Sequence, residues 1–186
     1  MLFNNIIFFL ITLNSFKLLM AGGDRRPFKL EMRNLTCNFL PPLVKRYNCS
    51  THKLNDSLYN LRIMFELSRA MSNNTDVFIQ MEFKPTRGVK NIKLVDVKFK
   101  VCQILGQVRR VPMVMKFVDS MMERSNLPLK CPIKGNFMYN VTNIMLSDTN
   151  FPTYMPSSTF DVNVTFFEKK DLLAYFTFGG DIIRRA

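Results

Sequence analysis

The chain has 186 residues, a length that accommodates one domain with a sizeable hydrophobic core. It is 47% hydrophobic, contains 18 Phe, 13 Met and no Trp, and carries a formal net charge of +12. A single histidine, His52, and the lack of paired-carboxylate, HExxH and Gly-rich phosphate-loop motifs exclude most catalytic constellations, so we expect neither enzymatic activity nor a cofactor.

Residues 1–22 are predicted to be a secretory signal peptide. Residues 6–13 are almost wholly apolar, and small residues at 21–23 offer a cleavage zone. A membrane anchor is the alternative, but a spanning helix needs about 20 apolar residues and this run is far shorter. Because no later segment is long and apolar enough to cross a membrane, residues 23–186 are predicted to be one secreted, extracellular domain.

Asn-x-Ser/Thr sequons support export, because the chain has six of them where composition predicts about two by chance. We expect glycosylation at Asn34, Asn48, Asn55, Asn73, Asn140 and Asn163.

Four cysteines follow the leader, and an even number favours a disulfide framework. Zinc is disfavoured because C-x₂-C spacing is absent and the lone histidine has no partner, so no metal site is expected. Sequential pairing, Cys37–Cys49 and Cys102–Cys131, is preferred, with chain-entropy contributions of about 3 and 3.5 kcal/mol. A bridge from Cys37 or Cys49 to Cys131 remains open.

Alternation of apolar and polar residues predicts strands along the first half of the mature chain. Residues 28–32 alternate, and Leu35, Cys37 and Phe39 continue with opposite parity, which predicts a bulge near Arg33–Asn34. A polar loop containing His52 is expected to follow. Later strands are predicted over residues 58–70, on the apolar face Val77, Ile79, Met81 and Phe83, and, after a turn at residues 85–88, on the face Val95, Val97, Phe99 and Val101.

The period changes at about Arg109. Val111, Met115, Val118 and Met122 recur at three- and four-residue steps, which predicts an amphipathic helix of about three turns over residues 112–124. Pro112 suits the first turn, and Asn126 and Pro128 end the helix.

Period-two alternation returns at Gly135. Further strands are predicted on the faces Phe137, Tyr139 and Val141, then Phe160, Val162, Val164 and Phe166, then over residues 172–178, with Gly179–Gly180 ending the fold. The fold class is therefore predicted to be all-β, a single antiparallel β-sandwich of about seven to eight strands with one short amphipathic helix.

The order of these features resembles a known family. Its most specific part is the block Ser125–Asn126, Cys131–Pro132 and Gly135, placed after a cysteine-bearing strand and an amphipathic helix and before an aromatic strand. The chain resembles a secreted family of unknown function that is expanded in insects and related to the chemosensory CheA and CheB proteins, and it is similar to the ML lipid-recognition superfamily. The resemblance implies an immunoglobulin-like sandwich whose sheets part to admit a lipid. It also implies a Cys102–Cys131 bridge.

Two functional hypotheses follow. The surplus of inward Phe and Met, with the resemblance, favours a carrier or co-receptor that binds an apolar small molecule or lipid between its sheets, the helix over residues 112–124 acting as a flap. The expected lining residues are Phe65, Phe78, Val97, Phe99, Met115, Met122, Phe137, Tyr139, Phe160, Val162 and Tyr175.

The alternative is an interaction module with a filled core. Residues 84–134 carry 12 Lys or Arg against three acids, which for a secreted chain favours anionic lipid headgroups, acidic ligands, an anionic glycan or an extracellular receptor over nucleic acid. The candidate anion-binding residues are Lys98, Lys100, Arg109 and Arg110. An apolar cavity above roughly 300 Å³ would favour carriage, and a filled core would favour surface interaction.

Overall fold

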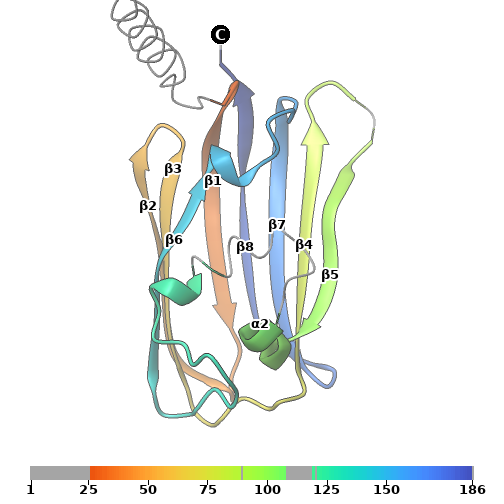
Figure 1. The fold of residues 1–186 in the computed structure, drawn as a ribbon. Coiled ribbons are helices and arrows are strands. Elements are labelled where there is room, and N and C mark those ends of the chain that lie inside the picture. Colours follow the sequence, from red (N-terminus) through yellow and green to blue (C-terminus); the bar gives the residue numbers. More distant parts are fainter. Residues whose placement is uncertain (1–25, 89, 108–118, 120, 186) are drawn as a thin grey trace, which may run out of the picture.

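The computed structural model describes residues 26–88, 90–107, 119 and 121–185. These residues form eight strands in two antiparallel sheets packed face to face (Figure 1). The five-stranded sheet has the order β1-β8-β7-β4-β5, and the three-stranded sheet has the order β2-β3-β6. The predicted all-β sandwich is confirmed. The elements are β1 (Phe28–Phe39), β2 (Val44–Asn55), β3 (Leu58–Leu67), β4 (Thr75–Pro85), β5 (Ile92–Lys100), α2 (Val101–Gln107), β6 (Met138–Ser147), the short 3₁₀ helix η1 (Asp148–Asn150), β7 (Ser158–Glu168) and β8 (Asp171–Arg184).

The predicted bulge in β1 is present. The pairing of β1 with β8 shifts register between Met32 and Asn34, which changes the parity of the inward side chains. Phe28 and Leu30 before the shift are fully buried, and Leu35 after it also faces the space between the sheets.

The polar loop predicted around His52 is wrong, because His52 lies within β2 opposite Asn60 of β3. Strand β2 pairs only with β3 and forms the edge of the smaller sheet. Most of its residues are exposed, so its sequence lacks the alternation that marks a half-buried strand.

The strand predicted to run through Val101 to Cys102 is also shorter than expected, since α2 begins at Val101. Val101, Ile104 and Leu105 follow the helical three- and four-residue spacing and lie on one face. Val101 also continues the alternation of Val95, Val97 and Phe99, and this coincidence explains the error. Most of the helix predicted over residues 112–124 lies outside the described residues; residues 121–123 are helical.

The fold does not end at Gly179–Gly180, because β8 continues through both glycines to Arg184. A Cβ at Gly180 would overlap the Glu31 carbonyl oxygen and lie within 2.7 Å of the Phe160 ring. Glycine is therefore required by close packing between β8 and its neighbours, and Ile182 beyond it is buried.

Strand β6 contains a second irregularity. Its pairing with β3 shifts register between Leu61 and Ile63, and Asn143 adopts a left-handed φ of 62°. The extra residue allows Val141 before it and Ile144 after it to point between the sheets.

Two disulfides join Cys37 to Cys49 and Cys102 to Cys131, so both sequential pairings are confirmed. The first links β1 of the larger sheet to β2 of the smaller sheet. The second links α2 to the loop that precedes β6. In the part of the chain that the structure describes, no helix has the length and apolar character needed to span a membrane.

Candidate ligand cavity

The core consists of two clusters of buried side chains. The first contains Phe83 and Phe160 together with Phe151, and its three rings lie with centroids 5.3–6.2 Å apart. The second surrounds Leu67 and Tyr139 near α2. Ile79 of β4 and Val164 of β7 are half-buried residues that pack against both clusters.

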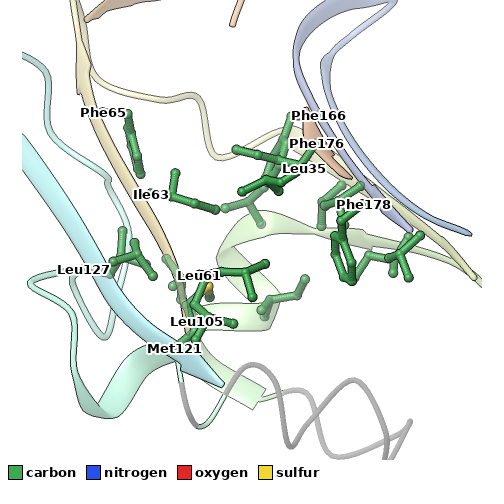
Figure 2. Close-up of a pocket in the computed structure, with 18 of the residues that line it drawn as sticks. Leu35, Leu61, Ile63, Phe65, Leu105, Met121, Leu127, Phe166, Phe176 and Phe178 are labelled. Atoms are coloured by element: carbon green, nitrogen blue, oxygen red, sulfur yellow. The ribbon is translucent and has the colours of Figure 1, made fainter. Parts of the chain in front are cut away.

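A cavity of about 260 Å³ lies between the sheets and is lined by members of both clusters. Figure 2 shows Ile63 and Phe65 on one wall, with Phe166 and Phe176 facing them. All 23 lining side chains that the structure describes are Leu, Ile, Val, Met or Phe, so none of these offers a conventional hydrogen-bonding group.

The size of the cavity restricts its occupant. An engineered apolar cavity of about 150 Å³ stays dry and binds benzene, whereas pockets for drug-sized ligands start at about 300 Å³. At about 260 Å³ this cavity lies between the two, and it falls somewhat below the limit of roughly 300 Å³ set above for carriage. The core between the two packed clusters is therefore hollow, and it suits a small apolar group.

The chemistry of the wall restricts the occupant further. A hydroxyl or amide buried without a hydrogen bond costs about 1–3 kcal/mol in proteins. Because the lining side chains in the described part of the chain offer no partner, this wall favours hydrocarbon over polar groups.

One side of the cavity is bordered by α2 and by residues 121–137, which lead into β6 and which we call the returning chain. Ile104 and Leu105 of α2 contribute to the wall, as do Met121 and Leu127. The Cys102–Cys131 bridge holds α2 against this returning chain.

The Ser125–Asn126 pair attaches the returning chain to the free edge of β6. Asn126 Nδ2 donates to the Met138 carbonyl at 2.9 Å, and the Asn140 N–H donates to Asn126 Oδ1 at 2.6 Å. Ser125 forms a bridge with Val141. The asparagine side chain thus supplies edge hydrogen bonds that another strand would otherwise make.

The cavity contains two of the residues predicted to line it, Phe65 and Val162. Val97 and Phe99 are half-buried and pack against the clusters without lining the hollow. Phe160 is fully buried in the solid part of the first cluster. Met115 lies outside the described residues.

Four further residues predicted to line the cavity do not line it. Tyr139 is close to the cavity but does not line it either. Phe78 occupies the opposite face of β4 from Val77 and Ile79. The Tyr175 hydroxyl accepts a hydrogen bond from Asn38 Nδ2 at 3.0 Å, away from the wall. Phe137 is exposed to solvent. Met121, rather than Met122, lines the cavity. Tyr139 is buried in the second cluster.

Sequence reasoning missed the two β8 residues Phe176 and Phe178. Their signal was the even-numbered series that continues through Gly180 to Ile182. The prediction that the strand ends at Gly179–Gly180 obscured this series.

Lys98 and Lys100, which were predicted to bind an anion, both form ion pairs with the Asp76 carboxylate of this chain. Lys100 Nζ lies 2.8 Å from Asp76 Oδ1, and Lys98 Nζ lies 3.0 Å from Asp76 Oδ2. Hydrogen bonds from Lys100 and then Lys98 lower the pKa of Asp76, against an opposing effect of burial. Arg109 and Arg110 lie outside the described residues.

The sequon asparagines occupy outer positions. Asn34, Asn48, Asn55, Asn73 and Asn140 are exposed, and Asn163 is partly exposed. Asn48 and Asn140 flank Met64 in register across the smaller sheet. Within the described ranges, no group of three or more His, Cys, Asp or Glu is arranged to hold a metal ion.

Residues 74–162 match a family model described as "Protein of unknown function (DUF1091)". The match runs from the turn before β4 into β7 and contains Cys102 and Cys131. The chain is thus similar to an uncharacterised family over this stretch.

No curated protein matches the chain. A solved structure described as "Crystal structure of protein from Archaeoglobus fulgidus" is 7% identical, with a TM-score of 0.25 over 77% of this chain and 98% of that chain. A likeness this distant gives no indication of function.

Proposed function

We propose that this protein is a secreted glycoprotein that binds a lipid-like or other apolar small molecule between its two sheets. The observation that carries the proposal is the hollow of about 260 Å³, whose described lining side chains are all apolar. Residual cavities destabilise proteins by about 24 cal/mol per Å³, so an empty hollow of this size costs about 6 kcal/mol. That is a large part of the 5–15 kcal/mol that stabilises a typical domain, and an apolar occupant would offset it.

The ligand class follows from size and chemistry together. The hollow suits a small apolar molecule, or one hydrocarbon chain whose polar head stays outside the wall. Three Met side chains, Met71, Met81 and Met121, are part of the wall, and their polarizable, unbranched side chains adapt to occupants of different shape.

The proposed setting is extracellular. Two disulfides are typical of oxidising compartments, and the leader-like residues 1–22 and the six sequons are consistent with export. Together with the resemblance to insect chemosensory families, these features favour a carrier or co-receptor without enzymatic activity. Peptide-N-glycosidase treatment of the protein secreted from cultured cells tests the setting: a fall in mass is expected, and a full-length intracellular product of unchanged mass would contradict it.

A fluorescent apolar probe, N-phenyl-1-naphthylamine, tests the binding function. The blocking variant is Ile79→Phe, because Ile79 lines the hollow and packs against both clusters. The matched control is Gln80→Phe, which adds the same ring one residue away on the opposite face of β4.

Wild type and Gln80→Phe are expected to bind the probe at one site, and Ile79→Phe is expected to lose at least 10-fold in affinity. Equal probe affinity in all three proteins, with each of them folded by circular dichroism, would place the apolar site elsewhere and refute the proposal. Retention of wild type on a heparin column without any probe binding would support the rival interaction module.

A further inference from the structure

Four loops meet at the end of the sandwich that lies away from the C-terminus (Figure 1). We call this the basic end and define it as residues 40–43, 68–72, 128–137 and 168–172. The Asn136 N–H donates to the Leu67 carbonyl at 2.6 Å, and Arg69 pairs with Glu168, so the loops contact one another.

Charge at the basic end is unbalanced. Its five cations are Arg69, Lys130, Lys134, Lys169 and Lys170, and its two carboxylates are Glu168 and Asp171. Arg69 and Glu168 neutralise each other. The four lysines are exposed and form no ion pair with any residue that the structure describes.

Large apolar side chains are exposed beside these lysines. Leu129 is 71% exposed and Phe137 is 47% exposed. The chain between them also turns inward, because Ile133 lines the ligand cavity, as does Leu127 just before it. One short segment therefore contributes both to the cavity wall and to an exposed apolar and basic surface.

We propose that the basic end binds peripherally to an anionic lipid bilayer. The lysines interact with lipid headgroups, and Leu129 and Phe137 enter the interfacial region. Lys or Arg near an anionic membrane contributes about 1 kcal/mol each, and exposed apolar side chains add binding that resists salt. The choice of this end rests on the proposed function. A hydrocarbon ligand that exchanges with a bilayer has to reach the cavity, and the segment with Leu127 and Ile133 forms part of the cavity wall.

The opposite end offers a charge-matched control. It carries the exposed cations Arg87 and Lys90 and the 80% exposed side chain of Tyr154. Its loops at residues 86–91 and 148–157 contribute no described residue to the ligand cavity. Removing two cations from either end changes the net charge equally, so non-specific attraction would weaken equally in both variants, whereas the proposal assigns binding to the basic end.

Sedimentation with vesicles of phosphatidylcholine containing 30% phosphatidylserine measures the interaction, with pure phosphatidylcholine vesicles as reference. Wild type is expected to bind the anionic vesicles and to lose affinity as salt increases. Lys130→Gln/Lys134→Gln is expected to weaken binding about 5-fold per lysine. Arg87→Gln/Lys90→Gln is expected to behave like wild type. Leu129→Ser should reduce the part of binding that persists at 0.5 M salt, with Phe137 supplying the remainder, and Tyr154→Ser should preserve it.

Three results would overturn the inference: no binding to anionic vesicles, equal losses in the two charge variants, or retention on heparin without vesicle binding. Probe binding to the cavity is measured in the same preparations. If probe affinity stays intact while vesicle binding fails, only the membrane surface is refuted. If the probe is not bound while vesicles are, the proposed function fails and the surface stands.

Discussion

Tyr139 and Lys134 are joined by two hydrogen bonds through a single phenol. The Lys134 N–H donates to the Tyr139 hydroxyl at 2.8 Å, and that hydroxyl donates to the Lys134 carbonyl at 3.2 Å. The buried ring of Tyr139 belongs to the second core cluster. The pair therefore fastens the loop that carries Ile133 to the beginning of β6.

Tyr139→Phe is expected to lower the free energy of unfolding by about 1–2 kcal/mol, because it removes both hydrogen bonds and keeps the ring. Urea denaturation followed by circular dichroism measures the change. Tyr154→Phe is the control, since Tyr154 is an exposed residue of the loop after η1. Equal stability of the two variants would show that the phenol does not hold the loop.

The two disulfides are expected to differ in function more than in stability. Cys37→Ser/Cys49→Ser and Cys102→Ser/Cys131→Ser open loops with sequence separations of 12 and 29 residues. Chain entropy predicts losses of about 3 and 3.5 kcal/mol.

Only the second bridge holds α2 beside the cavity, so only its loss is expected to weaken probe binding under conditions where both variants are folded. Probe titration of the two double variants compares them directly. A larger loss of affinity on opening Cys37–Cys49 would contradict the assigned role of α2 in the wall.

Acid is expected to destabilise the protein partly through Asp76. Lys100 and Lys98 lower the pKa of this carboxyl in the folded state, so it contributes stability above the unfolded pKa of about 3.9. That contribution is lost as pH falls below about 4 and through the lowered folded pKa.

Asp76→Asn is therefore expected to reduce stability at pH 7 and to flatten the dependence of unfolding free energy on pH between about 5 and 2. Asp171→Asn, at the exposed first residue of β8, is the control. Urea midpoints at several pH values give the result, and identical slopes for wild type and Asp76→Asn would refute the role of this carboxylate.

The parts of the fold that sequence predicted well are those with one buried and one solvated face. In β4, odd-numbered residues from Val77 to Phe83 face inward as alternation requires, and the parity change in β1 located its bulge. Edge strand β2 gave no such signal, because most of its residues are exposed.

The ligand site was less predictable, because it depends on which of the inward-facing apolar side chains border the cavity and which are packed on all sides. Alternation places both Phe160 and Val162 between the sheets, yet Phe160 packs against Phe83 and Phe151 while Val162 borders the hollow. Periodicity does not distinguish Tyr175 from Phe176, because β8 is apolar at both parities before Gly179. Packing in three dimensions, rather than periodicity, decides these positions.

Native mass spectrometry of the protein secreted from insect cells, after removal of glycans, tests the central claim most directly. Wild type and Gln80→Phe are expected to carry a reproducible non-covalent mass that dissociates in organic solvent, and Ile79→Phe is expected to carry none. A wild-type protein that is always free of ligand, and that stays free of added mass after incubation with N-phenyl-1-naphthylamine, would contradict the account.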